Sequence, residues 1–470
     1  MHISTLYGDY SCGSFGKEAR EFIDFLSDTG FSIWQVLPFG TSDECNSPYK
    51  SYSAFGGNPY FADLNTLYEK GYITYDEMQL QKQETPYSCE YKRLFENRVK
   101  LLCAASERVN GCEREKIEKF IGENKYLADF CKFMALKSAN GDKPWQEWDV
   151  FETDDKILFG WKFIQYEFFS QWNEIKKYAN EKNISIIGDI PIYVSHDSCD
   201  VWSNREEFLL DEKGYPTSVA GVPPDYFSKD GQLWGNPLYD WDKMKKNGYK
   251  WWVDRLSHML TMFDGIRIDH FRGLESFWSV DSGAKTAAEG KWIKGPGKDF
   301  IDAIKKVSDG KMIIAEDLGE ISEDVNSLVE YSSFPGMRVL QFGFLSFDDN
   351  SHLPHNYVKN CVAYTGTHDN NTLLGYLWEL DADKKKYLLE YCGYESDNWE
   401  GGFDSIVRTL YQSSADTVIL PIQDLLKYGS DTRLNTPGTS ENNWLYRITK
   451  EQLLSIDKEK YRRLNKLYKR

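Results

Sequence analysis

The most informative stretch for the fold is Gly265-Ile266-Arg267-Ile268-Asp269-His270-Phe271-Arg272. It reads as a short apolar strand that ends in charged residues. Side chains alternate along a strand, so Ile266 and Ile268 share one face while Arg267 and Asp269 share the other. Burying such charges costs several kcal/mol unless they are paired. An isolated stretch of this kind is as often a structural ion pair as an active site, so its meaning depends on what the rest of the chain places beside it.

Six further segments resemble this one, being short, apolar and rich in β-branched residues. Together with 265–271 they are 31–39, 184–193, 312–318, 336–342, 361–367 and 417–425. An eighth is expected at residues 1–6. Helical patterns such as 166–181 and 249–262 separate them, and this alternation is typical of a parallel sheet that is covered on both faces. We therefore predict an α/β fold, a (β/α)8 TIM barrel. A doubly wound open sheet is the alternative, although no G-x-G-x-x-G motif follows a strand.

Two insertions are expected within a single catalytic barrel that spans residues 1–470. Residues 66–148 are rich in Glu, Lys and Leu at helical spacing, notably in 94–108 and 115–138, which predicts a helical insertion. Residues 201–247 are rich in Gly, Pro, Asp, Trp and Tyr without a helical period. Long irregular segments in compact domains are usually functional, so this one is predicted to line the active-site cleft. No β-rich segment follows Trp444, and no C-terminal β-sandwich domain is expected.

Charge and composition exclude several classes of protein. The 470 residues carry a net charge of −17, which argues against nucleic acid or an anionic membrane as a partner. The chain has no run of 18 apolar residues and no charged-then-apolar leader, so a cytoplasmic location is expected. Nine scattered cysteines without CxxC spacing favour reduced thiols over disulfides or a zinc site. Aromatic residues make up 15% of the chain, a share that weakly favours a sugar-binding cleft.

Acidic residues stand at the ends of three of the predicted strands. They are Asp269, Glu316 in the sequence IIAEDLG at 313–319, and Asp369 in YTGTHDNN at 364–371. In a TIM barrel the C-terminal ends of all strands meet at one mouth, which is where the active site lies. The sequence therefore predicts that the three carboxylates converge.

Three converging carboxylates fit the chemistry of glycosidic bonds. That reaction needs one carboxylate as the nucleophile and one protonated carboxylic acid beside the leaving oxygen. Arg267 is expected to stabilise the charged form of Asp269, and His368 lies next to Asp369 in the sequence. Glu316 would keep a proton near neutral pH if burial and the other carboxylates raise its pKa.

Other interpretations of these residues remain open. A lone Asp after a strand is often a helix cap, and Asp189 and Asp317 are candidates for capping or positioning. Three carboxylates and a His can also hold a divalent ion. We predict neither a metal nor a cofactor, because Arg267 already supplies positive charge beside the cluster. Phosphoryl transfer is disfavoured, since no Gly-rich loop precedes a Lys.

Stretches along nearly the whole chain resemble the 4-α-glucanotransferases of glycoside hydrolase family 77, in the α-amylase superfamily. The stretches are 47–60 (SPYKSYSAFGGNPY), 188–202 (GDIPIYVSHDSCDVW), 220–239 (AGVPPDYFSKDGQLWGNPLY), 265–273, 291–297 (KWIKGPG), 314–319, 334–342 (FPGMRVLQF), 365–372, and 435–439 with Trp444.

The resemblance implies a retaining transglycosylase without a cofactor. Asp269 would be the nucleophile, Glu316 the acid and base, and Asp369 the residue that holds the 2- and 3-hydroxyls of the sugar. The resemblance also implies a set of substrate-binding residues, namely Arg267, His368, Tyr52, Ser53, Asp225, Gln232, Trp234 and Asn370. The implied donors and acceptors are maltooligosaccharides, amylose or glycogen, with glucose as product or acceptor.

Two alternative functions stay open, namely an α-1,4-glucan hydrolase and a non-catalytic glucan-binding protein on the same barrel.

One local departure from the family concerns the start of the chain. In the family the first barrel strand begins several residues before the point that matches residues 1–4. The first strand is therefore expected to begin at its middle, with the true N-terminus upstream, and to leave an unpaired edge in the barrel.

Overall fold

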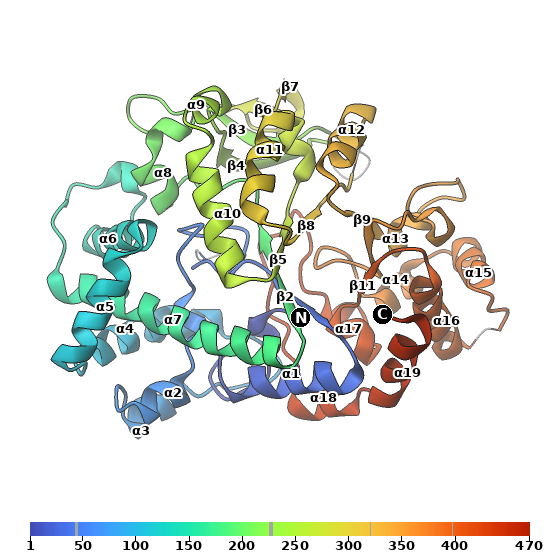
Figure 1. Ribbon diagram of the computed structural model, residues 1–470, viewed down its shortest axis with the longest axis horizontal. Coiled ribbons are helices and arrows are strands. Elements are labelled where there is room, and N and C mark those ends of the chain that lie inside the picture. Colours follow the sequence, from blue (N-terminus) through green and yellow to red (C-terminus); the bar gives the residue numbers. More distant parts are fainter. Residues whose placement is uncertain (43–45, 225–228, 320, 397) are drawn as a thin grey trace.

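The computed structural model describes residues 1–42, 46–224, 229–319, 321–396 and 398–470. Seven parallel strands form the central sheet, in the order β1-β2-β5-β8-β9-β10-β11 (Figure 1). They are β1 (Ile33–Gln35), β2 (Ser185–Ile190), β5 (Gly265–Ile268), β8 (Met312–Ala315), β9 (Gly336–Val339), β10 (Cys361–Tyr364) and β11 (Thr417–Ile419). This confirms the α/β barrel of the (β/α)8 TIM type that the sequence predicts.

Each of these strands lies inside its predicted segment but is shorter than that segment. All four residues of β5 and all four of β10 are buried, as expected for strands covered on both faces. After β5, β8 and β10 the chain leaves the strand at a polar residue, Asp269, Glu316 and Thr365 respectively. The ends of these three predicted segments are therefore outside the sheet, at the barrel mouth.

The predicted eighth strand at residues 1–6 was wrong. That segment contains a 3-10 helix, Ile3–Thr5, and in the described part of the chain no strand joins β11 to β1. The buried guanidinium of Arg447 donates to the carbonyl oxygens of Leu6 and Gly8, and Leu6 N donates to Ile3 O. These bonds turn the chain away from an extended course. Beside β1, the segment is held by single contacts, such as Trp34 Nε1 to Met1 O at 2.6 Å.

Helices surround the sheet and pack against one another in sequence, so that α16, α19, α1, α7, α10, α11 and α12 form a continuous outer layer (Figure 1). Their bounds are α1 (Lys17–Thr29), α7 (Asp155–Glu181), α10 (Lys250–Met262), α11 (Gly297–Ser308), α12 (Glu323–Ser332), α16 (Trp399–Gln412) and α19 (Lys458–Tyr468). Shorter helices lie in the connections, namely α13 (Leu340–Gly343), α14 (Leu373–Glu379), α15 (Ala382–Tyr391), α17 (Ile422–Leu426) and α18 (Lys450–Ser455).

Between β1 and α7 the described residues form five α-helices. They are α2 (Leu64–Glu69), α3 (Tyr75–Gln79), α4 (Tyr91–Ser106), α5 (Gly111–Gly122) and α6 (Lys125–Ala139). Helices α4, α5 and α6 pack against α7 (Figure 1). The region has further contacts with the barrel, such as the hydrogen bond of 2.7 Å from the Tyr126 hydroxyl on α6 to Asp254 on α10. The helical pattern predicted over 115–138 is divided between α5 and α6 at Glu123 and Asn124.

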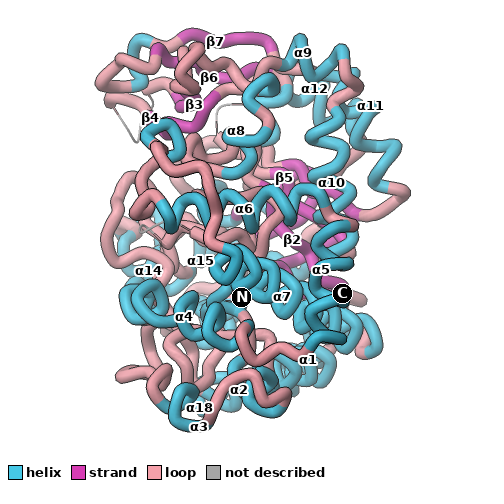
Figure 2. The backbone as a smooth tube through the Cα atoms, turned by 90° about the vertical axis from the view of Figure 1, so that its left-hand side faces the viewer, coloured by secondary structure: helices cyan, strands magenta, loops and turns pink. Residues whose placement is uncertain are grey.

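The description of residues 201–247 as wholly irregular was wrong. Besides α8 (Cys199–Ser203) and α9 (Trp241–Lys246), the region contains β3 (Ser218–Val222) and β4 (Gln232–Pro237). These pair in an antiparallel sheet of order β4-β3-β6-β7 with β6 (Ser276–Asp281) and β7 (Lys291–Lys294). Strand β3 pairs with the nearby β4 and also with β6, which lies more than fifty residues later, so its place in the sheet depends on a distant segment. Figure 2 shows this sheet at the upper end of the molecule, apart from β2 and β5.

Beyond β11 the described elements are all helical. No helix among the described residues is both long and apolar enough to cross a lipid bilayer.

Candidate active site

Neighbouring strands bring Asp269 and Glu316 to the same mouth of the barrel. Asp269 directly follows β5, and Glu316 directly follows β8, which is paired with β5 in parallel register. The ladder continues past both strands, since Glu316 N donates to Ile268 O at 3.1 Å and Asp269 N donates to Ile190 O at 2.9 Å. Two carboxylates thus project from adjacent strand ends, as the sequence predicts.

Arg267 is buried between two carboxylates. Strand register places it abreast of Asp189 on β2, and its Nη1 lies 2.8 and 2.9 Å from the two oxygens of that residue. Its Nη2 donates to Asp269 Oδ1 at 2.7 Å. A guanidinium in this position fixes the carboxylate of Asp269 in one orientation and balances charge that would otherwise be costly to bury. Asp189 is therefore a positioning residue and caps no helix.

The backbone N–H groups of His270 and Leu318 hold the carboxyl group of Glu316. His270 adopts a left-handed conformation with φ of 50°, and its N–H donates to Glu316 Oε2 at 2.6 Å. Leu318 N donates to the other oxygen at 2.9 Å. Burial and, after it, the negative charge of Asp269 raise the pKa of Glu316 to about 7. A carboxyl group in this state is protonated in a large fraction of molecules at neutral pH and can act as an acid.

Asp369 is in the opposite electrostatic state. Partial burial opposes its ionisation, but the charge and hydrogen bond of His368, with the hydrogen bond of Asn435, hold the pKa of Asp369 well below its usual range. His368 Nε2 lies 3.3 Å from Asp369 Oδ1, and Asn435 Nδ2 donates to the same oxygen at 2.6 Å. The pKa of His368 is raised, because the neighbouring Asp369 outweighs burial. Asp369 is therefore a charged acceptor at neutral pH.

Tyr49 connects Asp189 with His368. Its hydroxyl donates to Asp189 Oδ2 at 2.6 Å, and its ring is stacked on His368 with centroids 4.9 Å apart and an interplanar angle of 18°. Trp444 lies beside both rings, 6.0 Å from Tyr49 and 5.8 Å from His368. The three rings form an aromatic wall next to the carboxylates, and such a surface suits the flat face of a sugar.

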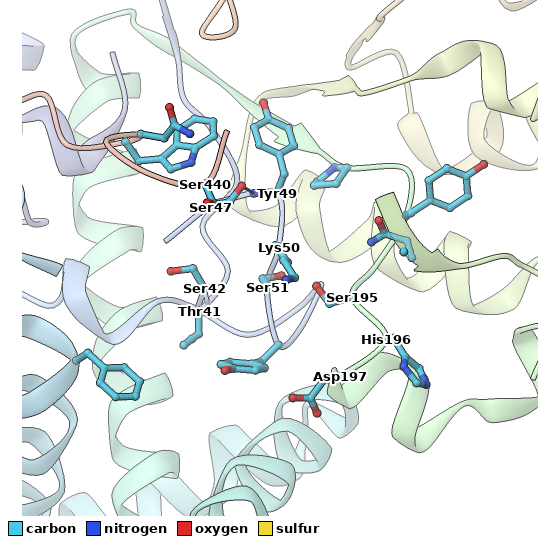
Figure 3. A pocket seen from close by; sticks show the side chains of 18 of the residues that line it. Thr41, Ser42, Ser47, Tyr49, Lys50, Ser51, Ser195, His196, Asp197 and Ser440 are labelled. Carbon is cyan, nitrogen blue, oxygen red and sulfur yellow. Dashed lines mark hydrogen bonds between the residues drawn. The ribbon is translucent and has the colours of Figure 1, made fainter. Parts of the chain in front are cut away.

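A cavity of about 1420 Å³ opens at Asp269, His368 and Asp369 and extends to the helical region of α4 and α6. Cavities that hold small ligands are usually about 300–1,000 Å³, so this one has room for an oligomer. Hydroxyl groups line much of it, and Figure 3 shows Thr41, Ser42, Ser51 and Ser195 around the space.

The structure distributes the predicted substrate-binding residues unevenly. Tyr52, Gln232 and Trp234 line the cavity, and Gln232 Oε1 accepts from Trp234 Nε1 at 3.2 Å. Ser53 is buried, and its hydroxyl accepts from the backbone N–H groups of Phe55 and Gly56. Asn370 Oδ1 accepts from Thr367 N and so shapes the loop that precedes Asp369.

Asp225 lies outside the described residues, so its role in substrate binding stays a prediction.

Tyr49, Asn435 and Trp444 belong to the site although nothing in their local sequence predicts a role. Each lies in a stretch that resembles the family, and this is the signal that could have identified them. Among the residues that the structure describes, no group of three or more His, Cys, Asp or Glu side chains is placed to hold a metal ion.

Comparisons with known proteins agree with this geometry. The family model described as 4-alpha-glucanotransferase, glycoside hydrolase family 77, matches residues 1–453. A 4-alpha-glucanotransferase of Clostridium butyricum is 43% identical over 488 residues, covering all of both chains. The amylomaltase of Streptococcus agalactiae, solved in complex with acarbose, superposes with a TM-score of 0.96 at 38% identity, covering 100% of this chain and 98% of that chain.

A more distant structure, the amylomaltase of Corynebacterium glutamicum, shares the fold with a TM-score of 0.81 at 19% identity, covering 99% of this chain and 74% of that one. The family model and the Clostridium relative extend over the barrel, the insertions and every residue of the site described above. The chain therefore belongs to glycoside hydrolase family 77, the family of 4-alpha-glucanotransferases.

Proposed function

We propose that this chain transfers segments of 1,4-α-glucans to the 4-hydroxyl of glucose or another glucan through a covalent intermediate on Asp269. The observation that carries the proposal is the contrast between two neighbouring carboxylates. Asp269 is ion-paired with Arg267, whereas burial and the charge of Asp269 raise the pKa of Glu316 to about 7. A charged nucleophile beside a protonated acid is the arrangement that a retaining mechanism requires.

In the first step a carboxylate oxygen of Asp269 attacks the anomeric carbon of the donor. The glycosidic C–O bond breaks, and the proton of Glu316 moves to the leaving oxygen, so that a shortened glucan departs. The hydrogen bonds from His270 N and Leu318 N then stabilise the carboxylate that Glu316 has become.

In the second step Glu316 takes the proton from the 4-hydroxyl of the acceptor. The acceptor oxygen attacks the anomeric carbon, the ester bond to Asp269 breaks, and both carboxylates return to their starting states. Two displacements at one carbon retain the α configuration.

Asp369 supports both steps. Its charged carboxylate would accept hydrogen bonds from the 2- and 3-hydroxyls of the sugar, in a position fixed by His368 and Asn435. Such bonds strengthen as positive charge develops on the ring in the transition state. Tyr49, stacked on His368, would limit where the ring can lie.

Transfer and hydrolysis share the first step and differ in what reaches the intermediate. A long cavity with hydroxyl and aromatic lining favours a sugar over water at that point, because a bound acceptor fills the space and excludes solvent. The acceptors and donors that fit the proposal are maltooligosaccharides, amylose and glycogen. The relatives named as 4-alpha-glucanotransferases support the same assignment.

Incubation with maltotriose, followed by chromatography of the products, tests this function. Glucose together with a ladder of longer maltooligosaccharides, absent with Asp269→Asn, is the expected result. Glucose and maltose without longer products would show hydrolysis instead, and binding of maltotriose without any product would indicate a glucan-binding protein.

A further inference from the structure

Lys137 is a buried charge that the mechanism above does not use. It lies on α6, in the helical region, and its side chain is 2% exposed. Lysine is rarely buried to this degree unless it is paired, because removing an ammonium group from water is costly. A lysine kept in this position therefore calls for an explanation beyond helix formation.

The ammonium group joins three separate segments of the chain. It donates to Asp142 O at 3.0 Å, to Lys143 O at 3.2 Å and to Asp197 Oδ2 at 2.6 Å. It also lies 4.9 Å from the centroid of the Tyr52 ring, within the range of a cation–π interaction. The three N–H groups are thus all used within the protein, so Lys137 has no donor left for a sugar.

Three of its partners face the cavity that begins at the carboxylates. Tyr52, Asp142 and Asp197 all line that cavity, as does Lys137 itself. The side chain of Asp197 is 29% exposed, and its second oxygen is fixed by Trp145 N at 3.3 Å. Figure 3 shows Tyr49 and Asp197 on opposite sides of this view, with Ser51 and Ser195 between them, so Asp197 lies away from the site of cleavage.

We propose that Lys137 is a positioning residue that holds the Tyr52 ring and the Asp197 carboxylate together as an outer glucose-binding subsite. An aromatic face and a charged acceptor are complementary to the apolar face and the hydroxyl edge of one glucose unit. The backbones of the two loops already meet, since Cys199 N donates to Tyr52 O at 2.8 Å, and Lys137 adds contacts between their side chains. Without Lys137, the Tyr52 ring would lose its cation–π contact and Asp197 Oδ2 would lose its hydrogen bond of 2.6 Å. The inference rests on the proposed glucan transfer, since it concerns how far from the cleavage point a chain is held.

The test is the Michaelis constant as a function of donor length, from maltotriose to maltoheptaose, for the full chain and for Lys137→Met. In the unchanged protein KM is expected to fall once the chain is long enough to reach the outer subsite. In Lys137→Met that fall is expected to disappear, which raises KM for the longest donor about tenfold, equivalent to about 1.4 kcal/mol of binding, while kcat and the KM for maltotriose stay within about twofold.

Lys70→Met is the matched control. Lys70 also forms an ion pair with a carboxylate that is itself buried, that of Glu167 at 2.8 Å, but neither residue lines the cavity. It should lower stability without changing how KM depends on donor length. Equal losses for short and long donors in Lys137→Met, or a fall in kcat for all of them, would show a merely structural role and overturn the inference.

Two further variants keep the inference testable if Lys137→Met does not fold. Tyr52→Ala removes the ring and should abolish the length dependence, whereas Tyr52→Phe should keep it. Asp197→Asn keeps the shape of the side chain but removes its charge, so it should raise KM for long donors only. Unaltered length dependence in Tyr52→Ala and Asp197→Asn would overturn the inference. A failure of the unchanged protein to transfer from maltotriose would instead contradict the proposed function.

Discussion

Arg267 forms ion pairs with both Asp189 and Asp269, so one guanidinium holds two carboxylates at the barrel mouth. Glu316 receives hydrogen bonds from two backbone N–H groups, and burial and then the negative charge of Asp269 raise its pKa. The chemical roles of Asp269 and Glu316 therefore follow from their surroundings, because the first is ion-paired and the second is buried beside a negative charge.

The first prediction at this scale is a loss of activity above neutral pH. Glu316 must be protonated for the first step, and burial and the charge of Asp269 raise its pKa to about 7. Protonation of Glu316 should therefore not limit kcat/KM below that pH. Above that pH, kcat/KM should fall about tenfold for each pH unit. The profile of initial rates with maltotriose measures it, and Glu316→Gln should lose both the activity and this limb. A profile that stays flat to pH 9 would contradict the assignment of Glu316 as the acid.

The second prediction concerns the hydroxyl of Tyr49. Tyr49→Phe keeps the ring stacked on His368 but removes the hydrogen bond to Asp189, so Asp189 depends on Arg267 alone. Hydrogen bonds to charged groups contribute about 1.5–3 kcal/mol, and we expect kcat/KM to fall about tenfold or more. Tyr49→Ala should cost more, since it also removes the ring. Wild-type kinetics in Tyr49→Phe would show that the ring alone matters.

At the scale of elements, β2 depends on a residue with no side chain. A Cβ placed at Gly188 would lie 2.3 Å from Cδ2 of the Phe263 ring, a contact that real side chains do not make. Gly188 precedes Asp189, so the close approach of Phe263 to β2 also fixes the strand that presents this carboxylate to Arg267. Packing at one position of the strand thus sets the geometry of the next.

The corresponding prediction compares two glycines. Gly188→Ala should lower the free energy of unfolding by about 1–3 kcal/mol, because the added methyl group displaces Phe263 or the strand. Gly122→Ala, at the end of α5 where a Cβ would meet nothing within 4 Å, should change it by no more than about 0.5 kcal/mol or stabilise the chain slightly. Urea unfolding curves of both variants measure the difference, and equal stabilities would contradict the packing argument.

The elements also show what a sequence can predict and why. The seven barrel strands are recognisable because strands covered on both faces are mostly apolar. Strands β3 and β4 are not, since half of β4 is exposed and β6, the second partner of β3, follows only after β5. Residues 1–6 look like a strand, but the contacts of Arg447, over four hundred residues away, turn them into a 3-10 helix.

The same reasoning applies to the site. Asp269 and Glu316 follow strands directly, so their convergence can be predicted from the fold, whereas Tyr49 and Asn435 come from loops whose course only the folded chain reveals. Lys137 is the extreme case, because a lysine in a helical pattern predicts an exposed position and the structure buries it.

At the scale of the whole molecule, the cavity runs from the barrel mouth to α4 and α6, so a bound glucan would touch both the barrel and the helical region. A ligand that binds only the folded state stabilises it by about 2.7 kcal/mol at a hundred times its Kd. For a chain of 470 residues this corresponds to a rise in Tm of about 3 °C.

We therefore expect maltoheptaose to raise the Tm of Glu316→Gln, a variant chosen so that turnover does not consume the ligand. Thermal unfolding followed by circular dichroism measures this, with a β-linked cello-oligosaccharide of similar length as the control. An equal shift with both sugars would contradict a groove shaped for α-1,4-glucans.

Trapping the covalent intermediate between the donor and Asp269 is the sharpest test of the proposed mechanism. A fluorinated α-glucosyl fluoride, which forms the ester faster than the ester breaks down, would be added to the protein, followed by proteolysis and mass spectrometry. We expect one glucosyl adduct on Asp269 that disappears when maltose is added as acceptor and does not form in Asp269→Asn. An adduct on Glu316 or Asp369, or transfer to maltose without any adduct, would contradict the proposed mechanism.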